Sequence, residues 1–507
     1  MQIAFRVDGS EAIGTGHIVR CLTLADHLSH EGHSCHFIIR DHPGAPVALI
    51  EAKGFSCSLL SPPDGTGREE LAHASWLGIS QARDAEESLA ALQGPVDWLV
   101  VDHYALDYRW HVLMRSIASK ILVIDDIADR RHDCDLLVDQ NLQIRSGRYE
   151  GLVPPACDVM LGPRYALLRP RFAELRVAMT EVRPDGPALV YFGGVDSQGA
   201  TLTALTAFSE PDMRDRPVDV VVGDLNPHRE TIHRWCVERG NARFHSGGSD
   251  MPTLMARASI AVGAAGVTAW ERCCLGVPTI LVTIAENQKP GAAALARECA
   301  AIWVGEAGSI SSDTIAAALR TLYAAPSLVT ALSHRAAALV DGRGTGRIAR
   351  AMASAPITVR TATADDCLPV WEWRNAEQTR RYFHDPAPVP IDDHRRWFAR
   401  SLQNPRRALL IGERSGEPVG VLRFDKRDDA VALVSIYLIP GREGKGEGTQ
   451  LLLAGHDWLA RNWPDVTAVE AEVLHANKAS SAAFLSAGFT LCRLLYRHIF
   501  KSEEPKK

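Results

Sequence analysis

The sequence predicts an α/β protein in which two similar α/β halves precede a smaller α+β domain. The length of 507 residues corresponds to about three to four domains, at roughly 100 to 200 residues per domain. Short apolar runs alternate with helix-length stretches in two successive series, which is typical of parallel sheets covered by helices. A fresh strand pattern after residues 353–356 indicates a third domain of about 150 residues.

The first half opens with a strand, a glycine loop and a helix. Residues 2–7 are strand-like, and the loop after them contains Gly14, Gly16 and His17. Apolar residues then recur at i, i+3 and i+4 spacing over residues 18–28, which predicts a helix. Further strands are expected at residues 36–40, 98–101 and 121–124.

A run of prolines between residues 153 and 187 interrupts this alternation. We place a domain crossover there, so that residues 1–170 form the first domain and residues 171–352 the second. The alternation then resumes, with strands expected at residues 188–192, 218–222, 260–262 and 279–282.

The third domain is expected to span residues 356–507. It begins with a strand at residues 357–360, and a glycine-rich turn at 440–448 separates the strand 431–439 from a helix at 449–462. A second glycine loop that opens a helix suits a pyrophosphate, because backbone N–H groups and the helix N-terminus favour an anion. A later strand is expected at residues 470–474.

Composition restricts the partners and the compartment. With 55 basic and 61 acidic residues the net charge is -6 at pH 7, which argues against a nucleic acid or an anionic membrane as partner. Neither a signal peptide nor a run of 18 apolar residues is visible, so we expect a cytoplasmic protein. Eleven cysteines without C-x-x-C pairs favour reduced thiols, and the neighbours Cys273 and Cys274 are expected to be buried.

The first glycine loop is the first candidate site. Open parallel sheets bind ligands at the carboxyl ends of their strands, where Gly14, Gly16 and His17 are expected to lie. The loop lacks the third glycine of a dinucleotide fingerprint and the lysine of a P-loop, so it is not specific by itself. A histidine at this junction can take a proton near neutral pH, although a lone histidine is more often structural.

Linked motifs over residues 1–340 make that site more specific. These motifs include Arg6, Asp8, Ser10, Gly14, Gly16, His17, Arg20 and Cys21, then Asp102-His103-Tyr104, Gly162, Tyr165, Arg169, Gly263, Gly266, Thr268, Trp270-Glu271-Arg272 and Glu286-Asn287-Gln288. Together they resemble the nucleotide-sugar hydrolases of pseudaminic acid biosynthesis, which release UDP from UDP-2,4-diacetamido-2,4,6-trideoxy-β-L-altropyranose.

The resemblance implies two Rossmann-like domains in a GT-B arrangement, closing on a nucleotide sugar without a metal. In such a site His17 would be the general base that activates water, and Asn287 would lie near the catalytic centre. Glu271 would accept hydrogen bonds from the ribose hydroxyls. The further implied UDP-sugar contacts are Gly14, Gly16, Tyr104, Arg169, Gly266, Thr268 and Gln288.

A metal is the main rival chemistry for the first two domains. Asp133 and Asp135 form a D-x-D sequence, which elsewhere holds a divalent ion against a nucleotide diphosphate. The pair directly precedes the apolar run 136–138 and is therefore interpreted as the entry to a strand.

The glycine-rich turn of the third domain contains Arg442, Gly444, Lys445, Gly446 and Gly448, and Asn477 follows the later strand. This pair of segments resembles the GNAT N-acetyltransferases, a fold that uses acetyl-coenzyme A, and the resemblance implies that these six residues contact the coenzyme. Glu443 stands where the family has glutamine or arginine, and Phe484 replaces the tyrosine that often protonates the thiolate, so no general acid is assigned. The amine must be neutral to attack a thioester, and Tyr437, Glu472 and His475 are candidates for the base.

The two resemblances imply consecutive reactions in pseudaminic acid biosynthesis. The third domain would acetylate the 4-amino group of a UDP-amino sugar, and the first two would then release UDP with inversion at the anomeric carbon. A GT-B glycosyltransferase fused to a protein or small-molecule N-acetyltransferase is the alternative. A regulatory module that only senses a UDP-sugar is a third hypothesis, and the oligomeric state is left open.

Overall fold

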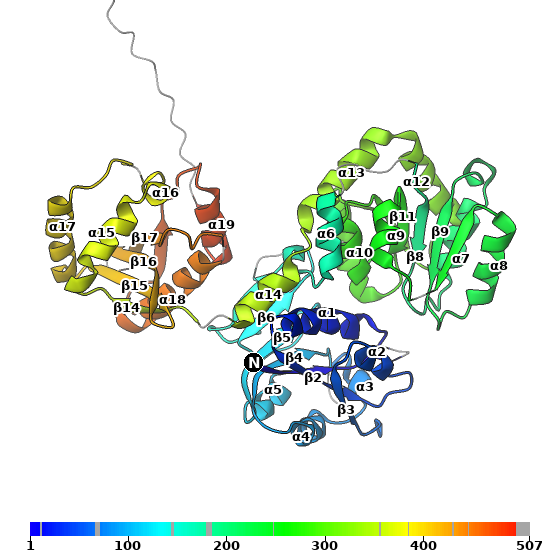
Figure 1. The fold of residues 1–507 in the computed structure, drawn as a ribbon, viewed down its shortest axis with the longest axis horizontal. Helices are drawn as coiled ribbons and strands as arrows, with labels where there is room; N and C mark the ends of the chain where they lie inside the picture. The colour runs from blue at the N-terminus through cyan, green and yellow to red at the C-terminus, as the bar shows by residue number, and fades with distance from the viewer. Residues whose placement is uncertain are drawn as a thin grey trace, which may run out of the picture. The chain divides into compact units, whose positions relative to one another are not determined.

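The computed structural model describes residues 1–10, 13–65, 71–142, 147–178, 185–246, 248–353, 356–383, 385–427, 430–444 and 446–492. The chain divides into two compact units, Met1–Met352 and Ala353–Lys507 (Figure 1). The first unit contains two α/β lobes, each built on its own sheet.

The first lobe is built on a seven-stranded sheet in the order β3-β2-β1-β4-β5-β6-β7, with all neighbours parallel. Its central strands are apolar along most of their length because helices cover both faces. The strands are β1 (Gln2–Val7), β2 (Ser34–Arg40), β3 (Ser56–Leu60), β4 (Val96–Asp102), β5 (Ala118–Ile124), β6 (Leu136–Asp139) and β7 (Asp158–Leu161). The helices are α1 (Gly16–His30), α2 (Val47–Ala52), α3 (Ala74–Leu77), α4 (Gln81–Ala91), α5 (Tyr108–Met114) and the short η1 (Pro163–Tyr165).

The second lobe repeats this architecture with a six-stranded parallel sheet in the order β10-β9-β8-β11-β12-β13. The strands are β8 (Ala188–Tyr191), β9 (Val218–Val222), β10 (Ala242–Ser246), β11 (Ile260–Ala264), β12 (Thr279–Thr283) and β13 (Ile302–Glu306). The helices are α6 (Pro170–Ala178), α7 (Ala200–Phe208), η2 (Pro211–Met213), α8 (Arg229–Arg239), α9 (Met251–Arg257), α10 (Val267–Cys274), η3 (Glu286–Gln288), α11 (Lys289–Arg297), α12 (Ser312–Ala324) and α13 (Pro326–Leu339).

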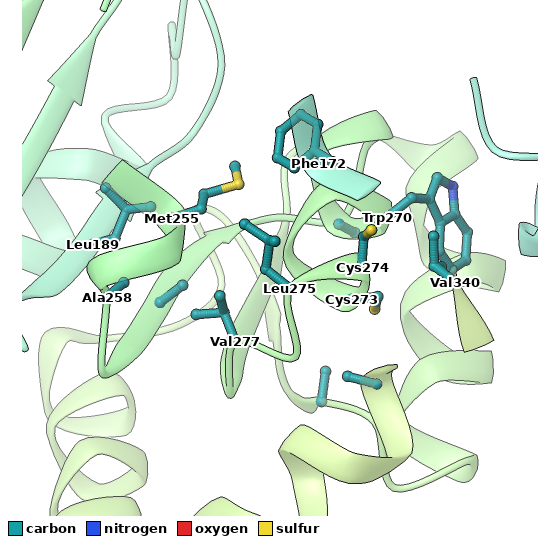
Figure 2. Packing of buried hydrophobic residues seen from close by; sticks show 14 of the residues in the cluster. Phe172, Leu189, Met255, Ala258, Trp270, Cys273, Cys274, Leu275, Val277 and Val340 are labelled. Carbon is teal, nitrogen blue, oxygen red and sulfur yellow. The ribbon is translucent and has the colours of Figure 1, made fainter. Parts of the chain in front are cut away.

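The core of the second lobe includes helix α6, which follows the crossover from the first lobe. Phe172 of α6 is fully buried in the same cluster as Trp270, Cys273 and Cys274 of α10 (Figure 2). Burial raises the pKa of each of these two thiols to about 12. The expectation that both cysteines are buried is confirmed.

Helix α14 (Gly344–Ala353) brings the chain back to the first lobe. Ile348, Ala349 and Met352 belong to the same hydrophobic cluster as the first-lobe strands, and Trp98 Nε1 donates a hydrogen bond of 3.0 Å to the Met352 carbonyl. Two Rossmann-like lobes with a final helix that returns to the first form the GT-B fold that the sequence predicts. The chain passes from the first lobe to the second before α6 and returns to the first lobe through α14. The boundary between residues 170 and 171 stays a prediction.

The second unit contains a five-stranded mixed sheet in the order β14-β15-β16-β17-β18. Only β17 and β18 are parallel; the other neighbours are antiparallel. The strands are β14 (Thr358–Thr361), β15 (Arg407–Arg414), β16 (Glu417–Lys426), β17 (Val431–Leu438) and β18 (Ala468–Ala471). The helices are η4 (Ala364–Asp366), α15 (Cys367–Asn375), α16 (Glu377–Arg380), α17 (Ile391–Gln403), α18 (Glu447–Asn462) and α19 (Lys478–Ser486).

Strand β18 differs from the strand expected at residues 470–474. It begins earlier and ends at Ala471, and the Leu474 carbonyl already accepts a hydrogen bond from the backbone N–H of Asn477 in a turn before α19. The expected strand therefore extends past the point where the backbone turns.

No single helix among the described residues is long and apolar enough to cross a membrane. One bent pair, Ser312–Ala324 with Pro326–Ala353, passes the same test by length and composition only.

Candidate functional site

The loop between β1 and α1 positions His17 at the carboxyl end of the first sheet. Gly14 has a φ of +79°, a conformation that favours glycine, and its N–H donates to the Ser10 carbonyl at 2.8 Å. Gly16 is the first residue of α1, so His17 lies in the first helical turn. The His17 side chain is 11% exposed, which leaves it partly accessible to a ligand.

A buried carboxylate orients the His17 imidazole. Asp102 lies at the end of β4, and its Oδ1 is 2.6 Å from His17 Nδ1. Burial opposes ionisation of Asp102, but the charge of Arg20 and the hydrogen bonds from Arg20 and His17 outweigh it and hold the pKa of this carboxyl below its usual range. An ionised carboxylate only accepts, so Nδ1–H donates in this contact, and in the neutral imidazole this tautomer leaves the lone pair on Nε2. A neutral imidazole held in this tautomer can act as a general base.

Arg20 connects this pair to a second acidic residue. Its Nε donates to Asp102 Oδ2 at 2.6 Å, and its Nη1 donates to Asp126 Oδ2 at 2.5 Å. The Tyr104 hydroxyl donates to the same Asp126 oxygen at 2.6 Å. Tyr104 is 3% exposed, and its ring lies edge-on to His17 with the ring centroids 4.8 Å apart. The network fixes the position of the His17 imidazole.

The second lobe provides a strand, glycine and helix unit of its own. Strand β11 leads through Gly266, in an extended conformation, into α10. Arg272 joins the two elements: its Nη2 donates to the Ala264 carbonyl at 2.5 Å, and its Nη1 donates to Thr268 Oγ1 at 3.3 Å. Burial lowers the pKa of Arg272 to about 10. The Ala269 N–H already donates to the Gly266 carbonyl at 2.8 Å, so an anion would meet the N–H groups before it at the start of α10.

Glu271 and Gln288 lie close to this turn. Burial raises the pKa of Glu271, although the positive charges of Arg169 and Arg272 oppose the rise, and Arg169 Nη2 is 3.5 Å from Glu271 Oε1. Gln288 Oε1 accepts from the Ile284 N–H at 3.1 Å, and its Nε2 is 3.7 Å from where a Cβ on Gly266 would lie. Gln288 therefore borders Gly266.

The predicted nucleotide-sugar residues fall into two groups. His17, Gly14, Gly16 and Tyr104 lie together in the first lobe. Gly266, Thr268, Glu271, Gln288 and Arg169 lie together on the second, and Asn287 is exposed beside Gln288 on η3. Their roles in binding and catalysis stay predictions.

No group of three or more histidine, cysteine, aspartate or glutamate residues is arranged to hold a metal ion in the described parts of the chain. Asp133 and Asp135 of the D-x-D sequence both bind Arg115, at 3.0 and 2.5 Å.

In the second unit, two parallel strands separate. β18 pairs with β17 only from Val431 to Val434, whereas β17 continues to Leu438 beside β16. Tyr437 lies in this continuation, is partly buried, and donates from its hydroxyl to the Val370 carbonyl at 3.4 Å. Burial raises its pKa.

The glycine turn after β17 leads into α18. Gly444 and Gly446 have φ values of +77° and +80°, and Gly446 is the N-cap residue of α18. Glu447, which is 2% exposed, accepts from Arg414 Nη1 at 2.6 Å and from Arg442 Nη1 at 3.3 Å. Arg442 is thereby held at the helix N-terminus. Gly448 follows in the first turn, and Lys445 lies outside the described residues.

The other acetyltransferase candidates are placed differently. The Asn477 side chain caps α19 by accepting from the Ser480 N–H at 3.0 Å. Glu472 is exposed, with Oε1 3.4 Å from Arg427 Nη2, and the exposed His475 lies 3.4 Å from Lys478 Nζ. Of the three base candidates, only Tyr437 lies on the separated part of β17.

Comparison with known proteins agrees with this division. Residues 357–490 match the family model described as an acetyltransferase (GNAT) domain. The chain is 23% identical over 299 residues to the UDP-2,4-diacetamido-2,4,6-trideoxy-beta-L-altropyranose hydrolase of Campylobacter jejuni, covering 59% of this chain and 97% of that relative. The chain fuses a hydrolase-like region to a GNAT domain.

Two further similarities concern the hydrolase-like region. The spore coat polysaccharide biosynthesis protein SpsG of Bacillus subtilis is 28% identical over 188 residues, which are 37% of this chain and only 56% of that relative. The solved structure of Acinetobacter baumannii MurG is 14% identical, with a TM-score of 0.46, and covers 69% of this chain and 99% of its own.

Sequence reasoning assigned no role to Asp102, Arg20 or Asp126. Asp102 and Arg20 belong to the motifs of the resemblance, but their pairing joins residues more than 80 positions apart. The parallel topology was the signal that could have brought Asp102 close to His17, because β1 and β4 are neighbours and their carboxyl ends meet.

Proposed function

We propose that the hydrolase-like region releases UDP from UDP-2,4-diacetamido-2,4,6-trideoxy-β-L-altropyranose. The hydrogen bond between His17 and Asp102 carries this proposal, because hydrolysis of a sugar nucleotide needs a base to activate water. Similarity to the C. jejuni enzyme, over nearly all of that relative, supports the choice of substrate.

In this reaction His17 Nε2 takes a proton from water while the oxygen attacks the anomeric carbon. The bond between that carbon and the β-phosphate oxygen breaks, and UDP leaves with the electron pair, so the configuration inverts. The first turn of α10 and Gly266 would hold the diphosphate, and Glu271 would accept from the ribose hydroxyls. Asn287 and Gln288 would contact the sugar side. No step requires a metal.

The GNAT domain would transfer an acetyl group from acetyl-coenzyme A to the 4-amino group of the preceding UDP-amino sugar. The neutral amine attacks the thioester carbonyl, forms the C–N bond and loses a proton, while the C–S bond breaks and the coenzyme leaves as a thiolate that gains a proton. Gly444, Gly446, Gly448 and Arg442 surround the N-terminus of α18, which suits the pyrophosphate of the coenzyme. The product of this step is the substrate of the hydrolase.

The hydrolase proposal is tested with the acetylated UDP-sugar and full-length protein. We expect wild type to release UDP, with or without a chelator such as EDTA, and His17→Ala to abolish release. His17→Ala should still acetylate the UDP-amino sugar. Loss of both reactions would show that the substitution damages the fold or that His17 has another role.

A further inference from the structure

Three aromatic side chains gather around the proposed base. The Trp76 ring stacks on Tyr104, with centroids 5.4 Å apart and planes at 23°, and meets His17 edge-on at 6.0 Å. His73 contacts both, with its ring centroid 4.8 Å from Trp76 and 5.3 Å from Tyr104. These residues form one aromatic wall beside His17.

The backbone anchors this wall. Trp76 lies on the short helix α3, and its neighbour Leu77 is 1% exposed in the first-lobe core. Gly78 ends the helix with a φ of +68°, and a Cβ there would come within 2.4 Å of Pro63. Leu77 therefore points inward, while Trp76 stays partly exposed next to the base.

Hydrogen bonding leaves the wall with an apolar surface. The Tyr104 hydroxyl is already engaged by Asp126 and Tyr104 is buried, so the accessible part of the wall is the partly exposed Trp76 ring, which is mainly carbon. His73 Nδ1 is buried without a hydrogen-bond partner among the described residues. The Asp102 network explains the place of His17 and Tyr104, but nothing in it requires Trp76 or His73.

We propose that Trp76, supported by His73 and Tyr104, recognises the sugar of the nucleotide substrate through its apolar face and its 6-deoxy carbon. The proposal rests on the proposed hydrolysis: a water activated by His17 Nε2 must reach the anomeric carbon, so the sugar ring lies next to the residues around His17. Aromatic faces favour C–H groups over hydroxyls, and a 6-hydroxyl buried there would lose its hydrogen bonds to water. Trp76 thus selects deoxy sugars.

The test compares binding of three probes by calorimetry: UDP, the UDP-linked diacetamido trideoxy sugar, and UDP-N-acetylglucosamine, which has a 6-hydroxyl. All proteins carry His17→Ala so that nothing turns over. We expect Trp76→Ala to weaken binding of the trideoxy sugar nucleotide about tenfold and to leave UDP unchanged, as the loss of one aromatic contact predicts. In Trp76→Ala the preference for the trideoxy sugar nucleotide over UDP-N-acetylglucosamine should fall. Trp76→Phe should restore part of that preference.

Trp235→Ala is the matched control, because Trp235 lies in the second lobe and donates to Ser209. It should change none of the three affinities. The proposal is overturned if Trp76→Ala leaves the ratio of the affinities for the trideoxy sugar nucleotide and for UDP as it is in the protein with His17→Ala alone. It is also overturned if Trp76→Ala and Trp76→Phe weaken the binding of UDP itself to the same extent. The ratio of the two affinities tests the role of Trp76 even if the wild-type protein releases no UDP. Absence of UDP release would refute only the proposed hydrolysis.

Discussion

At the scale of single residues, the position of His17 could be predicted from the sequence, but its hydrogen-bond partners could not. The glycine loop placed His17 at a strand end, whereas the role of Asp102 depends on two strands that meet only in the folded sheet. Arg20 then keeps Asp102 ionised within a network that is nearly closed to solvent. Trp76 lacked any sequence signal, since its segment lies between strands and carries no motif.

We expect Asp102→Asn to lower the rate constant of UDP release by about 100-fold or more. Asparagine keeps the shape, but its amide nitrogen can donate toward Nδ1 and stabilise the tautomer that blocks Nε2. Rates of UDP release at several pH values measure the effect. Glu31→Gln removes the exposed carboxylate that pairs with His27 at the C-terminal end of α1, and it should leave the rate unchanged. A wild-type rate in Asp102→Asn would contradict the orienting role.

Buried His132 should make the first unit sensitive to acid. Burial and Arg130 lower the pKa of His132 from 6.5 to about 4, although Asp125 acts in the opposite direction, and His111 stacks on its ring. Between these values the unfolded state binds the proton more readily. The free energy of unfolding should therefore fall by about 3 kcal/mol as pH drops from 6.5 to 4.

Urea unfolding between pH 7.5 and 4 measures this loss. His132→Phe should flatten the pH dependence over that window, whereas His30→Ala, at an exposed position of α1, should leave it as in wild type. An unchanged slope in His132→Phe would refute the assignment.

At the scale of elements, hydrophobic periodicity predicted most central strands. It could not predict the loops or the connections between the lobes. The strand expected at residues 470–474 is displaced from β18, which ends at Ala471, because the chain turns before α19. The return of α14 to the first lobe was also invisible, since its apolar face fits either core. Its first residue, Gly344, packs closely against the segment before α6, because a Cβ there would lie 2.3 Å from the Ala166 carbonyl oxygen.

We expect Gly344→Ala to destabilise the first unit by about 1 to 3 kcal/mol through this clash. Gly346→Ala in the same helix is the control: its Cβ would lie 3.5 Å from His27, an ordinary contact, and alanine favours the helix. Thermal unfolding of the full chain compares the two. Equal melting temperatures for both variants would show that the close approach at Gly344 does not matter.

At the scale of the whole molecule, the chain combines two units with separate cores. The domain order and both fold classes followed from the sequence, because each glycine loop opened a helix after a strand. Which residues of the two lobes meet a ligand together did not follow, since no periodic pattern records contacts between lobes. The separate cores predict that each reaction can be lost alone.

Gly446→Val should slow acetyl transfer while sparing UDP release. Gly446 has a φ of +80° at the N-cap of α18, a conformation that a β-branched residue adopts only with strain. We expect coenzyme A release to fall at least tenfold, an order of magnitude set by roughly 1–3 kcal/mol of strain. Loss of both reactions would contradict the separation of the units.

The central claim is that one chain acetylates a UDP-amino sugar and then releases UDP from the product. The direct measurement supplies the UDP-4-amino sugar to full-length protein with and without acetyl-coenzyme A, and follows free thiol and free UDP together. We expect thiol to appear first and UDP after it, with little UDP when the acetyl donor is omitted. Thiol release that is never followed by UDP would contradict the two-step account.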